Sequence, residues 1–132
     1  MEKLYVDTNV FLDAIEERTS RNGLDFGTRA KNLFSRAQYG DFQIIVSDWT
    51  LEELYKKADH EEVKEILSNI GDNLIRCGYT EDQKQRAKEA SNHWGDYLHG
   101  IIAKEENADC IVTRDDDLRD LSGLKVKFPS HI

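Results

Sequence analysis

Asp7 is the residue whose position points most directly to chemistry. It follows the short apolar segment Lys3–Val6 and precedes Thr8 and Asn9, after which an apolar helical pattern begins. Ligands of parallel α/β folds gather at the carboxyl ends of strands, so a carboxylate in this place is a candidate site residue. The alternative is that Asp7 or Asn9 only caps the following helix, because both residue types are preferred at that position.

Two further candidate acids lie on predicted helices. Glu53 stands beside Glu52, and helical phase alone does not choose between them. Each glutamate by itself is explained as a solvated side chain. Asp96 opens a later helix, where an acid also stabilises the helix dipole. Small residues at Gly100 and Ala103 share its face and permit close approach to a sheet.

The last candidates form an acidic run after the apolar segment Asp109–Thr113. Asp115, Asp116 and Asp117 are consecutive, and adjacent carboxylates repel one another unless a positive group binds them. A solvated turn that caps a helix is the alternative. The run again follows a predicted strand, which makes Asp115 a candidate for the same site as Asp7.

Taken together, these acids predict a metal site. If the first and fourth strands are neighbours at a topological switch point, Asp7 and Asp115 face each other across the crevice. Glu53 and Asp96 then enter from helices on either side. Ligands that offer only oxygen favour magnesium or manganese over zinc.

The elements that position these residues alternate along the chain. Apolar segments predict strands at Lys3–Val6, Phe42–Val46, Asn73–Tyr79, Asp109–Thr113 and Leu124–Phe128. Helical patterns fill the intervals, and they include Val10–Glu17, Phe26–Tyr39 and Asp96–Glu106. Ser47 and the Thr80–Gln83 capping box mark further helix starts. Alternation with short loops predicts a parallel α/β sheet covered by helices on both faces, within a single domain over residues 1–132.

The bulk composition is that of an ordinary globular chain. Of its 132 residues, 39% are hydrophobic and 33% charged, and no apolar run is long enough to span a bilayer. The charged first residues do not form a signal peptide, so we expect a cytoplasmic protein without a membrane partner. Cys77 and Cys110 are predicted to be buried free thiols.

The charge of the chain is uneven. The net charge is −8, yet the segment 18–39 holds five bases and one acid. Phosphate backbones are attracted by such a patch whatever the total charge of the protein. Arg18, Arg21 and Arg29 are therefore candidates for RNA binding, and the alternatives are solvated helix residues or a surface for a protein partner.

Four segments in order resemble the PIN-domain family of metal-dependent nucleases. They are Val6-Asp7-Thr8-Asn9-Val10-Phe11-Leu12-Asp13, Val46-Ser47 with Leu51-Glu52-Glu53-Leu54, Asp96-Tyr97-Leu98-His99-Gly100-Ile101-Ile102-Ala103, and Val112-Thr113-Arg114-Asp115-Asp116-Asp117-Leu118. The resemblance selects Glu53 over Glu52, because the family's glutamate precedes an apolar residue and lies six positions after the serine.

The resemblance implies an α/β/α sandwich with five parallel strands in the order 3-2-1-4-5. It also implies an endoribonuclease in which one or two Mg²⁺ or Mn²⁺ ions activate water for in-line attack on a phosphodiester. It assigns ligand roles to Asp7, Asp96 and Asp115, a ligand or orienting role to Glu53, and an accessory role to Asp117. Thr8, Asn9 and Thr113 resemble the family's supporting polar residues. Small members are often VapC-type toxins that pair with an antitoxin, and many are homodimers.

Two other functions remain open at this level. A PIN-like module that binds RNA or protein without cutting is disfavoured by the intact set of acids. An α/β phosphatase with Asp7 as nucleophile is disfavoured because such enzymes usually place a second aspartate two residues on, where this chain has Asn9.

Overall fold

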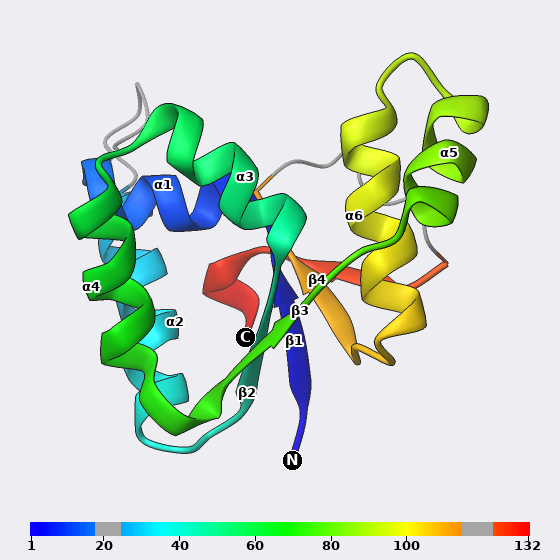
Figure 1. Cartoon of the computed structure of the whole chain (residues 1–132). Helices are drawn as coiled ribbons and strands as arrows, with labels where there is room; N and C mark the ends of the chain where they lie inside the picture. The colour runs from blue at the N-terminus through cyan, green and yellow to red at the C-terminus, as the bar shows by residue number, and fades with distance from the viewer. Residues whose placement is uncertain (18–24, 115–122) are drawn as a thin grey trace.

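A parallel sheet organises the computed structural model, which describes residues 1–17, 25–114 and 123–132 (Figure 1). Its strands are β1 (Lys3–Val6), β2 (Gln43–Ser47), β3 (Leu74–Cys77), β4 (Cys110–Val112) and β5 (Lys125–Lys127). They lie in the order β3-β2-β1-β4-β5, and every neighbouring pair is parallel. The predicted strand order is confirmed. β1 pairs with both β2 and β4, so the switch point lies beside it.

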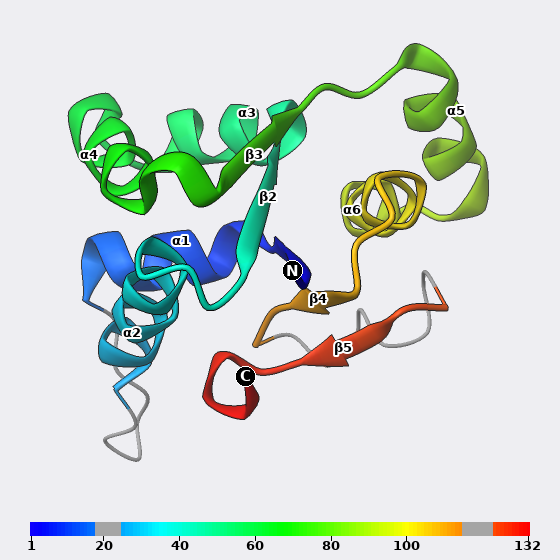
Figure 2. The same ribbon diagram turned by 90° about the horizontal axis from the view of Figure 1, so that it is seen from below.

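Helices connect the strands along the described part of the chain. They are α1 (Thr8–Glu16), α2 (Phe26–Gln38), α3 (Asp48–Lys57), α4 (His60–Ile70), α5 (Glu81–Ala90) and α6 (Trp94–Glu105), with short 3₁₀ turns η1 (Gly71–Asn73) and η3 (Pro129–His131). The first four helices cover one face of the sheet, and α5 and α6 cover the other (Figures 1 and 2). This is the α/β/α sandwich that the resemblance implies.

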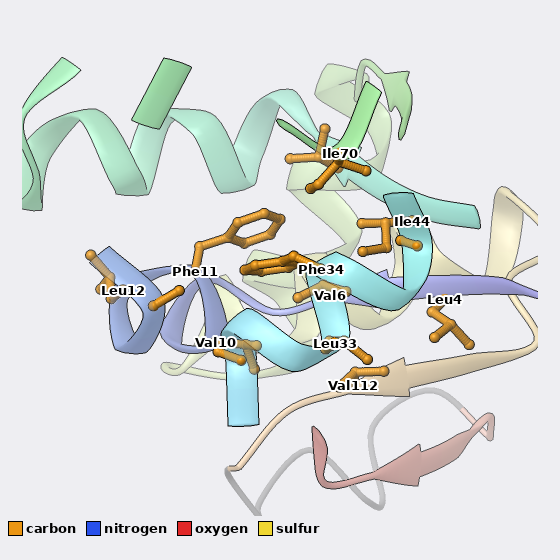
Figure 3. Packing of buried hydrophobic residues seen from close by; sticks show 14 of the residues in the cluster. Leu4, Val6, Val10, Phe11, Leu12, Leu33, Phe34, Ile44, Ile70 and Val112 are labelled. Carbon is orange, nitrogen blue, oxygen red and sulfur yellow. The ribbon is translucent and has the colours of Figure 1, made fainter. Parts of the chain in front are cut away.

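Alternate residues of β1 point to opposite layers, which is why the strand is apolar throughout. Leu4 and Val6 pack beneath α1–α4, whereas Tyr5 packs on the side of α5 and α6. The larger cluster is shown in Figure 3, where Phe11 of α1 stacks on Phe34 of α2 with ring centroids 4.9 Å apart. Rings that stack in this way fix the two helices against each other.

Helix ends follow the signals in the sequence, with small differences. Thr80 and Gln83 form the predicted capping box of α5, and Ser47 caps α3 as predicted. α1 begins at Thr8, earlier than the predicted Val10, because Asp7 itself is the N-cap. α6 begins at Trp94, so Asp96 belongs to its first turn instead of opening it.

The composition also led to expectations about the two cysteines and about membrane-spanning helices. Cys110 is buried, Cys77 is half-buried, and both are free thiols. Burial raises the pKa of each thiol to about 11, so neither is a reactive thiolate. Among the helices that the structure describes, none has the length and apolar character to cross a membrane.

Candidate active site

Asp7 lies at the carboxyl end of β1, between the ends of its neighbours. Its backbone N–H donates to the carbonyl of Val112, at the end of β4. Its carboxylate is buried, with 6% of the residue exposed. Oδ1 accepts the backbone N–H of Thr8 at 2.8 Å and Oδ2 accepts the hydroxyl of Thr113 at 2.9 Å. The capping role and the site position thus coincide in one residue, and each oxygen keeps lone-pair capacity for a further ligand.

Glu53 of α3 is brought to Asp7 by two intermediaries. Its Oε1 accepts the Thr8 hydroxyl at 2.6 Å and lies 2.6 Å from Nε2 of His99. The same His99 nitrogen lies 3.6 Å from Oδ1 of Asp7. Glu52, in contrast, is exposed and accepts the Tyr79 hydroxyl on the outer side of α3. The structure therefore places Glu53, and not Glu52, beside Asp7.

His99 is held from its other side by a buried hydroxyl chain. Its Nδ1 lies 2.7 Å from the Tyr5 hydroxyl, which lies 2.7 Å from the Ser47 hydroxyl. Thr50 closes the chain at 3.1 Å from Ser47. His99 is 1% exposed, so these contacts replace water completely. A buried network of this kind fixes the ring orientation and, through it, the Glu53 carboxylate.

The charges of this pair reinforce each other. Burial alone would raise the pKa of Glu53, but the hydrogen bond and charge of His99, aided by Thr8, bring that pKa below its ordinary value. Burial alone would lower the pKa of His99, but Tyr5 and the carboxylates of Glu53 and Asp7 raise it well above the ordinary value. Each partner therefore favours the charged form of the other.

Asp96 enters from the first turn of α6 and is half-buried. The turn that carries it lies next to Glu53, since a Cβ placed on Gly95 would be 4.0 Å from Glu53 Oε2. Trp49 ties the two helices together through an N–H that donates to the Gly95 carbonyl at 3.2 Å. The structure therefore brings the Asp96 turn to the same end of the sheet as Asp7 and Glu53.

Asn9 and Thr113, to which the resemblance gives a supporting role, are linked to Asp7 by hydrogen bonds. The Asn9 amide donates to the Thr113 hydroxyl at 3.3 Å, and that hydroxyl donates to Asp7. The other amide atom, Asn9 Oδ1, is buried and accepts no hydrogen bond from any residue that the structure describes. A buried oxygen in that condition is a position for water or a cation.

Several predicted residues lie outside the described residues: Asp115, Asp117, Arg18 and Arg21. Arg29 is described and stands half-buried on α2. Over residues 1–17, 25–114 and 123–132 no three His, Cys, Asp or Glu side chains are close enough to hold a metal ion. The described residues thus supply part of the expected ligand set.

The donor chemistry of that part fits a hard divalent cation. Asp7 offers two buried carboxylate oxygens, Glu53 offers Oε2, and Asn9 offers an unbonded amide oxygen. These are the oxygen ligands that Mg²⁺ and Mn²⁺ take.

The sequence did not predict that His99 and Tyr5 belong to the site. His99 follows Asp96 by three positions and so shares its helix face, which was the available signal. The sequence also did not predict that Arg114 donates to Asp13 at 2.7 Å, an ion pair in which Asp13 is 2% exposed. Asp13 lies on the buried side of the first predicted helix, and a charged residue in such a place usually has an ion-pair partner.

The fold and its acids define a class: an α/β/α protein with carboxylates at the switch point of a 3-2-1-4-5 sheet. The family model described as PIN domain matches residues 3–117. The chain belongs to the PIN-domain family. No curated protein matches the chain in sequence.

Solved structures share the fold at low identity. The VapBC2 complex of Rickettsia felis bound to a promoter DNA fragment matches with a TM-score of 0.63 and 18% identity, over 94% of this chain and 96% of that one. VapC20 of Mycobacterium tuberculosis, a toxin that cleaves the sarcin-ricin loop, matches with a TM-score of 0.60 and 16% identity, over 87% and 92%. FitAcB of Neisseria gonorrhoeae matches with a TM-score of 0.59 and 15% identity, over 98% and 99%.

Proposed function

We propose that this protein is a metal-dependent endoribonuclease that hydrolyses RNA phosphodiester bonds. The observation that carries the proposal is the buried Asp7 carboxylate at the end of β1, joined to Glu53 through Thr8 and His99. Family membership and the fold shared with a toxin that cleaves the sarcin-ricin loop support it.

In this proposal Asp7, Glu53, Asp96 and Asp115 hold the Mg²⁺ or Mn²⁺, and Asp117 is an accessory ligand. A bound divalent cation supplies charge stabilisation at the phosphoryl oxygens and makes water a better nucleophile. The chain's own residues orient the carboxylates. Thr8 and Thr113 fix the two oxygens of Asp7, while His99 and Thr8 fix Oε1 of Glu53.

The test is Asp7→Asn in a cleavage assay with single-stranded and structured RNA, with Mn²⁺ and with chelator. The amide keeps an oxygen for Thr8 or Thr113 but loses the ligand charge. We expect cleavage to fall more than about 100-fold, because even the outer partners of metal ligands are worth about 10- to 100-fold. The matched control is Asp72→Asn, an exposed residue of η1 remote from the site.

Three outcomes would contradict the proposal. If a folded Asp7→Asn protein cuts RNA at the wild-type rate, Asp7 has no role in cleavage. RNA that is bound but not cut, in Mg²⁺ and in Mn²⁺, favours a binding module. Phosphate release from a phosphomonoester without RNA cleavage favours the phosphatase.

A protein partner is the second part of the proposal. Two of the structural neighbours are complexes by name, VapBC2 and FitAcB. We propose that this chain likewise pairs with an antitoxin and forms a homodimer. Light scattering of the purified protein, alone and mixed with a candidate antitoxin chain, tests both.

A further inference from the structure

A cavity of about 360 Å³ opens beside the acids and is not explained by the proposed chemistry. Its described walls come from α1, α2, the residue after Thr113, and the end of the chain after β5. They are Asp13, Phe26, Arg29, Arg114, Phe128, Pro129, Ser130 and His131. The volume is at the small-ligand end of the range for binding pockets, which suits one nucleotide and not a duplex.

The cavity neighbours the site, because its wall residue Arg114 is the next residue after Thr113. The Thr113 hydroxyl donates to Asp7, and the Thr113 backbone N–H donates to the Lys127 carbonyl at 3.0 Å. That second bond fixes the end of β5, from which Phe128 and η3 continue. The parallel strands β4 and β5 lie side by side (Figure 2), so the residues that follow them, Thr113 with Arg114 and Phe128 with η3, lie at the same carboxyl edge of the sheet.

Two guanidinium groups give the cavity its charge. Arg114 is fixed by the ion pair with Asp13 at 2.7 Å and by Phe26, whose ring centroid lies 4.8 Å from its Cζ. Arg29 also lines the cavity and makes no ion pair within 4 Å with any residue in the described ranges. With Asp13 neutralised by Arg114, Arg29 gives the described wall a net positive charge in a protein of net charge −8.

Aromatic rings give the cavity its second property. Phe26 stands on one wall, and Phe128 with His131 stands on another, their ring centroids 5.6 Å apart. Planar rings beside guanidinium groups are the combination that holds single-stranded nucleic acid, because a base stacks on the ring while the cation meets the phosphate.

We propose that this cavity binds one nucleotide of single-stranded RNA next to the scissile bond, with its base against Phe128 and its phosphate against Arg29. The inference rests on the proposed function, since it names a subsite for the same substrate. It also explains how an acidic protein holds a polyanion: the acids repel phosphate, and the cations of the neighbouring cavity attract it.

The experiment measures the Kd of a labelled single-stranded oligoribonucleotide in chelator, where cleavage is absent, by fluorescence anisotropy. We expect Arg29→Gln to weaken binding and to lower the slope of log Kd against log salt by about 0.7, the value for one phosphate contact on a single strand. We expect Phe128→Leu to weaken binding about tenfold through lost stacking. Ser130→Trp fills the cavity without removing a wall and should also weaken binding.

Matched controls are Arg76→Gln on β3, at the opposite edge of the sheet, and Tyr39→Leu, an 86% exposed aromatic at the far end of α2. Both should bind RNA as the wild type does. Melting temperatures of all variants show whether a weakened variant is also unfolded, and Ser130→Trp still tests the cavity if Phe128→Leu is unstable.

The outcomes separate this inference from the proposed function. RNA affinity and salt slope that are unchanged in Arg29→Gln, Phe128→Leu and Ser130→Trp would overturn the subsite, whether or not the protein cuts RNA. Variants that lose binding to a protein partner while they keep the RNA Kd would overturn it in favour of a protein surface. Weakened RNA binding in a protein that never cleaves would support the subsite and contradict the nuclease.

Discussion

Tyr5 affects the acid site only indirectly, through His99, which contacts Glu53. Its side chain is fully buried in the layer of α5 and α6, yet its hydroxyl reaches Ser47 and His99, each at 2.7 Å. His99 in turn meets Glu53 at 2.6 Å. A residue from the central strand thus holds an acid of α3 through a ring of α6. We expect Glu53 to lose its fixed orientation when this chain is broken.

Tyr5→Phe tests this arrangement, because it removes one hydroxyl and keeps the ring. The free energy of unfolding should fall by about 1–3 kcal/mol, the cost of leaving buried partners unsatisfied. The proposed cleavage should fall about 10- to 100-fold in kcat with little change in KM, as for partners that orient a metal ligand. Urea unfolding and steady-state kinetics measure the two effects.

Tyr39→Phe is the control, since Tyr39 is exposed and should leave both quantities unchanged. A Tyr5→Phe protein with wild-type kcat would show that the hydroxyl chain serves stability alone.

At the residue scale, the sequence pointed to local features of the candidate site but not to its contacts between distant segments. Asp7 was recognisable because a strand end is a local pattern, and Glu53 followed from the resemblance. His99 and Arg114 were not predicted, because their partners are remote: Tyr5 precedes His99 by 94 positions and Asp13 precedes Arg114 by 101. Residue types and short spacings carry no information on contacts that arise only when distant elements pack.

At the element scale, α1 and α2 are packed unusually closely where α2 begins. A Cβ added to Gly27 would lie 2.7 Å from the Glu17 Cα and 3.0 Å from the Asp13 carbonyl oxygen. Both are backbone atoms, so no side-chain rotation relieves the clash. Gly27 lies between Phe26 and Arg29, which line the cavity together with Asp13 of α1.

Gly27→Ala should therefore destabilise the protein. Alanine favours the helix over glycine by about 0.5–1 kcal/mol, but overpacking against backbone costs about 1–3 kcal/mol. We expect the free energy of unfolding to fall by about 1–2 kcal/mol in urea titrations. Gly78→Ala is the control, because its Cβ would meet Asp48 Oδ2 at an ordinary 3.6 Å. Equal stability of Gly27→Ala and wild type would show that the two helices can move apart without loss.

The elements themselves were largely predictable, for local reasons. The capping box at Thr80 and the cap at Ser47 mark helix starts by short-range hydrogen bonds that the structure contains. The start of α1 was misplaced, because the apolar pattern begins at Val10 while the cap at Asp7 already begins the helix. Boundaries thus follow caps more closely than apolar periodicity.

At the scale of the whole molecule, charge is separated along one edge of the sheet. Asp7 and Glu53 meet through His99 at the end of β1, with the turn that carries Asp96 next to Glu53, while Arg29 and Arg114 line the neighbouring cavity. The strand order places these groups side by side, because β1, β4 and β5 end at the same edge. The net charge of −8 gives no sign of this separation, because it sums over the whole chain, and the strand order brings the two kinds of charge together.

Divalent cations should therefore stabilise the folded protein. A cation that binds only the folded state raises its stability by RT ln(1 + [metal]/Kd). At a concentration of about 100 times Kd this is about 2.7 kcal/mol, so the melting temperature should rise by roughly 10 °C for a domain of this size. Mn²⁺ titrations followed by calorimetry measure the shift, with KCl at equal ionic strength as the salt control. Asp7→Asn should show a much smaller rise than Asp72→Asn. Equal rises in these two variants, or a rise that KCl reproduces, would show that the cation acts on the protein's overall charge and not at the Asp7 site.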